Sequence, residues 1–211
     1  MVKHWDVVTI GNVSRNRYWG ESEERAVRPV ICTCTAIFGD DFVLVVDPSL
    51  EDRDRMAFEL DRRTGLKLDD VGLVFLTHAH GDHWVGLPHF GPAEWLAAPS
   101  VAQGINGTGK LAKQVEPVEG RIRDSIDVVH TPGHTLDHHS LRFDCDGYSI
   151  VVAGDAVMNR DFWRERRGFF NSVDKELAGK TIERLWAFAD IVVPGHDNYF
   201  LAQRRELGEQ R

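Results

Sequence analysis

Basic charge and long apolar runs are both scarce in this chain of 211 residues. Lysine and arginine total 25 against 33 aspartates and glutamates, a formal net charge of −8, so no basic excess indicates a nucleic-acid partner. No stretch approaches the roughly 18 to 20 apolar residues of a membrane span. Asp6 falls where a signal peptide needs its apolar run. These absences predict a cytoplasmic protein without a nucleic-acid or membrane partner.

Cysteine is equally scarce, since only Cys32, Cys34 and Cys145 are present. Three cysteines are too few for a disulfide framework in a chain of this length, which favours reduced thiols in a cytosol. Cys32 and Cys34 would share one face of a strand. A metal or redox pair is one interpretation of them, but we expect small buried apolar side chains and assign them no role.

The composition is that of an ordinary globular protein, with 42% hydrophobic residues. Neither a repeat nor a linker divides the chain, so we predict one domain, residues 1–211. Apolar runs bounded by turn residues predict strands at 7–10, 30–38, 42–46, 71–76, 126–129, 141–143, 149–153 and 191–193. Helical spacing predicts helices at 52–63, at 175–189 and from about Tyr199, and 104–109 is the clearest candidate for a flexible loop. Strand clusters with helices between them predict an α/β protein with mixed sheets.

The densest chemical signal is the segment 77–83, Thr-His-Ala-His-Gly-Asp-His, directly after a predicted buried strand. His78 and His80 are two apart in an extended turn and can point at one ion. Asp82 and His83 lie where the next helix begins and can point at a neighbouring ion. Zinc and similar metals bind such mixtures of imidazole and carboxylate.

Three further candidates each follow a predicted strand and a glycine. They are His134 in Thr-Pro-Gly-His, Asp155 in Ala-Gly-Asp and His196 in Val-Pro-Gly-His. Strand ends of this kind can meet at one edge of a sheet, so these side chains are predicted to converge on a metal.

The order of these motifs resembles that of the metallo-β-lactamase-fold hydrolase superfamily across nearly the whole chain. The resemblance implies a four-layer αββα sandwich of two mixed β-sheets flanked by helices, with a dinuclear metal site at one edge of the sheets. It also implies a ligand set: His78, His80 and His134 for the first metal, Asp82, His83 and His196 for the second, and Asp155 between them. Asp47 matches an early strand-end aspartate that supports the ligands from behind. His138 and His139 match no ligand position and are expected to lie behind the site or in loops.

Departures from the family pattern indicate to which subfamilies of the superfamily the chain does not belong. Metallo-β-lactamases proper lack the bridging aspartate, and flavodiiron relatives carry glutamate where this chain has Ala79. Fifteen residues follow His196 and no long insert is visible, so we expect the bare catalytic fold without the extra domains of glyoxalase II or β-CASP relatives. Many relatives have Gly-Gly where this chain reads Trp84-Val85-Gly86, and Trp84 is expected to serve packing.

The predicted activity is hydrolysis of a small ester, thioester or lactone by a hydroxide that bridges two divalent metal ions. Zinc is the first choice and iron or manganese the alternatives, and Asp82 is assigned to orient the nucleophile or relay its proton. A phosphodiesterase or nuclease of the same fold is the alternative, supported only by the arginines and aromatics of 160–170. Those arginines are also explained by a solvated loop. A mononuclear iron dioxygenase is a more distant third, and a homodimer remains open.

Overall fold

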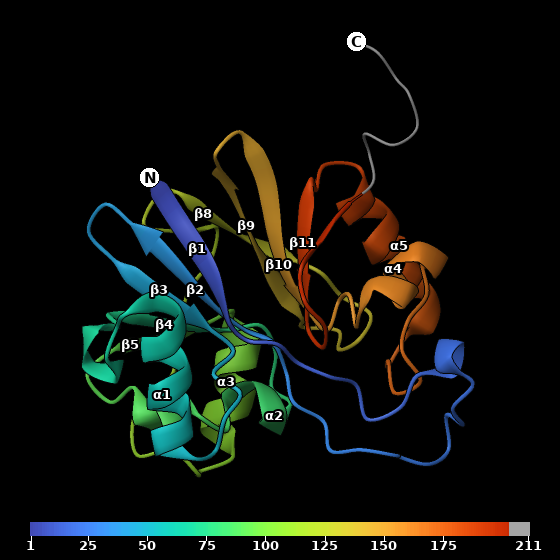
Figure 1. Ribbon diagram of the computed structural model, residues 1–211, viewed down its shortest axis with the longest axis horizontal. Coiled ribbons are helices and arrows are strands. Elements are labelled where there is room, and N and C mark those ends of the chain that lie inside the picture. The colour runs from blue at the N-terminus through green and yellow to red at the C-terminus, as the bar shows by residue number, and fades with distance from the viewer. Residues whose placement is uncertain (203–211) are drawn as a thin grey trace.

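Two six-stranded β-sheets lie face to face in the computed structural model, which describes residues 1–202 (Figure 1). The first sheet has the order β1 (Val2–Thr9), β2 (Cys34–Gly39), β3 (Val43–Val46), β4 (Leu73–Leu76), β5 (Glu94–Ala97), β6 (Glu116–Pro117). The second has the order β12 (Phe200–Leu201), β11 (Ile191–Pro194), β10 (Tyr148–Gly154), β9 (His139–Cys145), β8 (Ile126–His130), β7 (Arg121–Ile122). Each sheet contains parallel and antiparallel pairs, which confirms the predicted mixed sheets.

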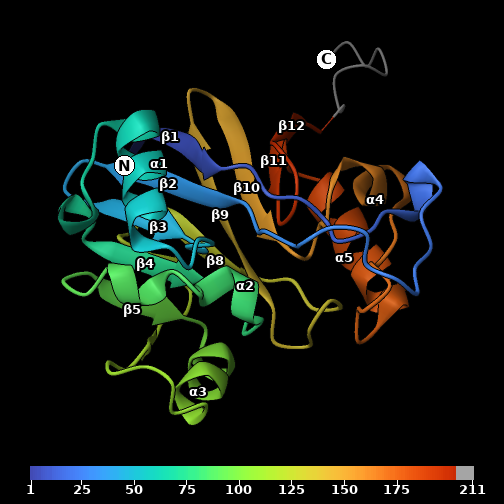
Figure 2. The same cartoon turned by 60° about the horizontal axis from the view of Figure 1, so that its bottom comes forward.

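Helices cover the outer faces of both sheets, as Figures 1 and 2 show. The helices are α1 (Arg53–Thr64), α2 (Gly81–Trp84), α3 (Pro99–Gly107), α4 (Arg160–Glu165) and α5 (Lys175–Trp186), with 3₁₀ turns at Arg17–Trp19, Leu68–Asp70 and Leu87–His89. α1 to α3 lie on the side of the first sheet, and α4 and α5 lie on the side of the second. The four layers are those of the predicted αββα sandwich. None of the helices within residues 1–202 is long and apolar enough to cross a membrane.

Three apolar clusters hold the layers together. Met56 and Leu60 of α1 are fully buried against the first sheet. Side chains such as Phe75 and Phe143 fill the space between the sheets, and Ile182 of α5 packs on the second sheet. The apolar residues that predict the strands and helices are thus the ones that pack the layers together. Burying each large side chain stabilises the fold by roughly 1.5 to 3 kcal/mol.

Helix α1 begins and ends within one residue of its predicted bounds, 52–63. The side chain of Asp52 accepts a hydrogen bond from the backbone N–H of Arg55 (2.7 Å) and caps the first turn. Gly65 adopts φ 75° just after the last turn and donates its N–H to the carbonyl of Asp61.

Two local predictions are wrong. The segment 104–109 is not a flexible loop, since its first four residues belong to α3. Burial of Val101, Ala102 and Ile105 outweighs the helix cost of about 1 kcal/mol for each of the two glycines. The predicted helix from Tyr199 is a strand at Phe200–Leu201, where Phe200 pairs with Val192 and is buried. The rest of that predicted helix lies outside the described residues.

Candidate metal centre

The candidate ligands come from strand ends that share one edge of the two sheets. β3 and β4 are parallel, and Asp47 and the segment 77–83 follow them. β10 and β11 are also parallel, and Asp155 and His196 follow these strands. β8 runs in the same direction as β10 because both are antiparallel to β9, so the loop that carries His134 starts at the same edge. A hydrogen bond from the N–H of His139 to the carbonyl of Thr77 (2.9 Å) joins the two sheets there.

The structure brings all seven predicted ligands together in two groups. Within each group the ligand atoms lie no more than 4.8 Å apart. One group is His78, His80, His134 and Asp155, and the other is Asp82, His83 and His196. Asp82 and His80 are partly exposed, and the other five side chains are buried.

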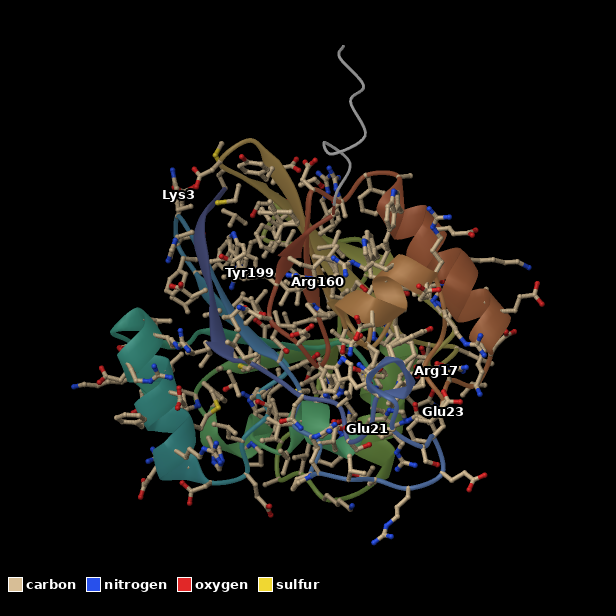
Figure 3. The ribbon with its side chains drawn as sticks, turned by 45° about the vertical axis from the view of Figure 1, so that its right-hand side comes forward. Lys3, Arg17, Glu21, Glu23, Arg160 and Tyr199 are labelled. Atoms are coloured by element: carbon tan, nitrogen blue, oxygen red, sulfur yellow. The ribbon has the colours of Figure 1, made fainter. Side chains whose placement is uncertain are left out.

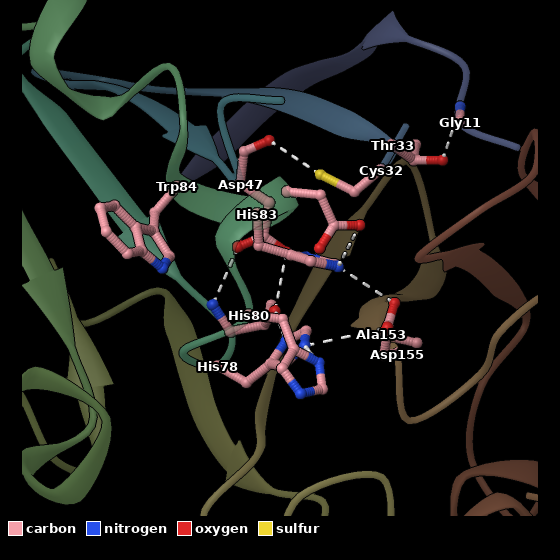
Figure 4. A network of polar contacts seen from close by, with 12 residues as sticks. Gly11, Cys32, Thr33, Asp47, His78, His80, His83, Trp84, Ala153 and Asp155 are labelled. Atoms are coloured by element: carbon pink, nitrogen blue, oxygen red, sulfur yellow. Dashed lines mark hydrogen bonds and ion pairs between the residues drawn. The ribbon is translucent and has the colours of Figure 1, made fainter. Parts of the chain in front are cut away.

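Asp155 faces both groups, one carboxylate oxygen to each (Figure 4). Its Oδ2 lies 3.1 Å from Nε2 of His134 and 3.8 Å from Nε2 of His78. Its Oδ1 lies 3.1 Å from Nε2 of His196 and 3.2 Å from Nε2 of His83. A single carboxylate in this position can bind two metal ions at once.

Asp47 sets the hydrogen positions on two of the histidines. Its Oδ2 accepts hydrogen bonds from Nδ1 of His83 (2.8 Å) and from Oγ1 of Thr77 (2.7 Å). Since the Thr77 hydroxyl donates to Asp47, it accepts from Nδ1 of His78 (3.1 Å). In their neutral forms both imidazoles therefore carry their hydrogen on Nδ1 and turn a lone pair on Nε2 toward the site. Asp47 has the supporting role that the family resemblance implies.

His196 is oriented in the same way by a carbonyl. Its Nδ1 donates to the backbone oxygen of Ile31 (2.8 Å), which leaves Nε2 free to bind a metal. The N–H of Thr33 donates to the carbonyl of Gly195 (2.6 Å) and fixes the same loop.

The donor set fits a metal ion better than it fits a hydrogen-bonded network. Nδ1 of His80 lies 2.9 Å from Nε2 of both His78 and His134, so three nitrogens gather at one point. A single N–H between them can satisfy at most one of these two contacts well, whereas one metal ion can bind a lone pair from each nitrogen. Nε2 of His83 and Oδ1 of Asp155 are buried, and no hydrogen bond satisfies either atom within residues 1–202.

The electrostatics of the two groups differ. Burial, together with the charge of His83, holds the pKa of His78 well below its usual range, and burial lowers the pKa of His80. Burial also disfavours protonated His196, but the carboxylate of Asp155 outweighs it and raises the pKa of His196. The pKa of Asp155 itself is well below its usual value because the charges of His196, His83 and His134 outweigh the effect of burial. The carboxylate of Asp155 is thus stabilised in its anionic form before any cation binds.

His138 lies behind the ligands, as expected of a histidine outside the family pattern. It is fully buried, its Nδ1 lies 2.8 Å from Oγ1 of Thr131, and its ring centre lies 5.0 Å from that of His78. Burial holds the pKa of His138 well below its usual value, so the ring packs against His78 as a neutral group.

Cys32 and Trp84 lie beside the site. Burial raises the pKa of the Cys32 thiol to about 12, so it is neutral and unreactive, as expected for a small buried side chain. The Trp84 ring is buried, and its Nε1 donates to the carbonyl of Ala79 (3.0 Å), between the first two histidine ligands. Trp84 packs and also fixes the backbone of the ligand loop.

A cavity of about 270 Å³ opens beside the two groups. Its lining includes ligands from both groups, and its other walls are Val13, Ser14, Val30, Met158, Phe169, Phe170 and Asn171. The four arginines of 160–170 do not line it, because their side chains are exposed on and after α4. The arginines are exposed, as the solvated interpretation expects, but Arg160–Glu165 form a helix and not a loop, and Arg166 lies over the Trp186 ring. Phe169 and Phe170 do form part of the cavity wall. The sequence pattern does not indicate that residues 13, 14 and 30 face this site. Positions 13 and 14 lie outside every predicted element, and the strand predicted at 30–38 begins only at Cys34, which leaves Val30 in the preceding segment.

The glycine before His196 is required by Asp155. A Cβ atom at Gly195 would clash with Oδ1 of Asp155 and lie 2.9 Å from the backbone carbon of Gly154. We expect Gly195→Ala to displace the bridge and to lower metal content per chain, measured by elemental analysis. Gly91→Ala is the matched control, since a Cβ there meets nothing within 4 Å. Equal metal content in both variants would show that Asp155 does not depend on this close approach.

Comparison with known proteins agrees with this geometry. A family model described as the metallo-beta-lactamase superfamily matches residues 27–196. A "probable metallo-hydrolase" of Methanocaldococcus jannaschii is 26% identical over 154 residues, which are 73% of this chain and 70% of that protein. An N-acyl homoserine lactonase of a Bacillus species is 27% identical in an alignment of 168 positions that covers 71% of this chain and 65% of the lactonase.

Solved structures show the same fold at lower identity. A Bacillus thuringiensis protein with N-decanoyl-L-homoserine bound at its active site aligns with a TM-score of 0.71 and 18% identity. The alignment covers 93% of this chain and 94% of that one. The two chains therefore share the arrangement of layers described above.

Proposed function

The chain belongs to the metallo-beta-lactamase superfamily and is a metal-dependent hydrolase, and on this basis we propose that it uses two divalent metal ions to hydrolyse a small neutral ester, thioester or lactone. The position of Asp155 carries the proposal of two metals. One of its oxygens faces the first group of histidines and the other faces the second, so it would join two ions. His78, His80 and His134 would hold one ion, and Asp82, His83 and His196 the other.

Zinc is the metal we propose first, because borderline cations favour imidazole-rich sites with carboxylates. When bound, such ions lower the pKa of water and polarise carbonyl oxygens, which supplies both a nucleophile and charge stabilisation. The protein then needs no serine or cysteine nucleophile, in agreement with the unreactive Cys32.

Asp82 is the proposed proton carrier of the site. Its side chain is 26% exposed, and its Oδ2 lies 3.6 Å from Nε2 of His196. It also lines the cavity, so a carboxylate oxygen faces the space where substrate and water meet. From that position Asp82 can orient the attacking water and pass its proton to the leaving group.

The cavity supports a neutral substrate of small size. Its volume of about 270 Å³ lies just below the range of drug-sized ligand sites, roughly 300 to 1,000 Å³. Valine, methionine and phenylalanine form most of its wall away from the proposed ligands, and no lysine or arginine of residues 1–202 lines it. An apolar acyl or alkyl group fits this wall, whereas a phosphodiester would find no cationic side chain there. The Bacillus lactonase makes lactones the first class to test.

A panel of four substrates tests this function. We expect zinc-loaded protein to hydrolyse p-nitrophenyl acetate, a short acyl thioester or γ-butyrolactone at least ~10²-fold faster than bis(p-nitrophenyl) phosphate, a difference of about 2.7 kcal/mol. Dialysis against a chelator should abolish the activity and added zinc restore it. Preferred turnover of the phosphodiester would favour the nuclease alternative, and ester hydrolysis that survives chelation would contradict the metal mechanism.

A further inference from the structure

A long segment between β1 and β2 forms one side of the cavity. We call residues 11–31 the strap. In Figures 1 and 2 it leaves the end of β1, extends to the side of α4 and returns to β2. Val13, Ser14 and Val30 of the strap line the cavity, and the carbonyl of Ile31 orients His196. The strap thus touches both the substrate space and one of the metal ligands.

The strap has two arms, residues 11–15 and 27–31, joined by a tip, residues 16–26. Hydrogen bonds hold the two arms together. The carbonyl of Ser14 accepts hydrogen bonds from the N–H groups of Val27 (2.9 Å) and Arg28 (3.3 Å). The guanidinium of Arg28 donates to the carbonyl of Val13 (3.1 Å) and pairs with Glu21. Figure 3 shows Glu21 with Arg17 and Glu23 on this segment, close to α4. Because the arms are tied together, a displacement of the tip is transmitted to Val13 and Ser14.

The tip of the strap is held by one carboxylate of α4. Oδ2 of Asp161 accepts hydrogen bonds from Nδ2 of Asn16 (2.8 Å) and from Nε1 of Trp19 (3.0 Å). Asn16 is fully buried, and its Oδ1 accepts the N–H of Tyr18 (3.0 Å). Asp161 and the strap are 142 to 145 residues apart in the chain, so these bonds fix the strap to a distant element.

A row of aromatic rings leads from this contact to the cavity wall. Tyr18 meets Phe162 with ring centres 5.0 Å apart, Phe162 meets Phe169 at 5.1 Å, and Phe169 meets Phe170 at 4.6 Å. Arg15 of the strap lies over the Phe170 ring, 4.3 Å from its centre. Phe169 and Phe170 line the cavity, so both of its apolar walls depend on how the strap meets α4.

We propose that Asp161 is a positioning residue that determines substrate specificity, because its hold on Asn16 and Trp19 keeps the strap closed over the cavity and limits the length of the apolar group that fits. The proposal rests on the function proposed above for the choice of substrate class. Asp161 itself does not line the cavity, so it acts through the strap and the aromatic row.

Binding of straight-chain carboxylates to zinc-loaded protein tests the proposal without requiring turnover. The probes are acetate, butyrate, hexanoate and octanoate, measured by calorimetry. In the parent protein we expect affinity to rise about fourfold per buried methylene until the cavity is full and then to fall. In Asp161→Ala the strongest binding should move to a longer chain, with the octanoate-to-acetate affinity ratio raised ~10-fold or more.

Trp19→Phe keeps an aromatic ring and removes one of the two hydrogen-bond donors to Asp161. It should therefore shift the chain-length profile in the same direction as Asp161→Ala but by a smaller amount. Arg164→Ala, an exposed residue of the same helix, should leave the profile unchanged. Hydrogen exchange of the strap, followed by mass spectrometry, should be faster in Asp161→Ala than in Arg164→Ala.

The outcomes separate this proposal from the proposed function. If esters and lactones are not hydrolysed but the carboxylate profile shifts in Asp161→Ala, the function fails and the positioning role stands. The opposite outcome is hydrolysis of esters or lactones together with the same chain-length profile and the same hydrogen-exchange rate of the strap in the parent, Asp161→Ala and Trp19→Phe. That result would overturn the positioning role of Asp161.

Discussion

Asp155→Asn should lower kcat by ~10³-fold, equivalent to about 4 kcal/mol, and reduce the metal content from two ions per chain to one. Asp155 presents one oxygen to His134 and the other to His196, at 3.1 Å each. An asparagine has one carbonyl oxygen, and its NH₂ group cannot bind a cation. One metal therefore loses its anionic ligand, while the shape of the buried side chain is kept.

The control for this variant is Asp197→Asn, one residue after a proposed ligand. The Oδ1 atom of Asp197 accepts the N–H of Asn198 (2.8 Å), which an asparagine oxygen can also do. Metal content is read by elemental analysis and kcat with the best ester or lactone of the panel. Two metals and near-parental kcat in Asp155→Asn would mean that the carboxylate is not a bridge.

Asp47→Asn should weaken metal binding at the second site without unfolding the protein. Asp47 accepts three hydrogen bonds, from the Thr77 N–H, the Thr77 hydroxyl and Nδ1 of His83. An amide NH₂ facing Nδ1 of His83 forces that nitrogen to accept, so the ring hydrogen moves to Nε2 and blocks the metal position. We expect metal affinity at this site to fall by roughly 10- to 100-fold, the usual effect of losing such a supporting contact.

Asp52→Asn is a matched control for this substitution. Asp52 also accepts a backbone N–H, at the start of α1, where asparagine caps a helix as well as aspartate does. Metal titration and circular dichroism of both variants provide the test. Parental metal affinity in Asp47→Asn would show that Asp47 does not set the hydrogen position of His83.

The convergence of the proposed ligands could be predicted from sequence because their motifs are local. In each one, a short strand is followed by a turn and then by a histidine or an aspartate, as at His134 and His196. Strand direction alone then brings these turns to one edge. The early aspartate at position 47 was identified through the family pattern, and the structure shows the physical basis of its role in the bonds to Thr77 and His83.

The cavity wall could not be predicted in the same way. Val13 and Asn16 lie outside every predicted element, and the strap that carries them is held by contacts with Asp161 and Phe162 far along the chain. The arginines near Asp161 were the stronger signal in the sequence, but they lie at the surface, where Arg160 and Arg166 stack over Phe200 and Trp186. Long-range pairing of this kind leaves no pattern that spacing can detect. Helix α3 does not follow from the sequence pattern for a different reason. Its two glycines indicate a loop and obscure the helical spacing of the buried Val101 and Ile105.

Elemental analysis of protein purified without a chelator tests the central claim most directly. Zinc, iron and manganese are counted per chain in the parent and in His196→Ala. A dinuclear hydrolase predicts close to two metal ions in the parent and about one in the variant, since His196 belongs to the second group alone. One iron per chain, unchanged by the substitution, would contradict the dinuclear mechanism and direct the search to oxygen chemistry.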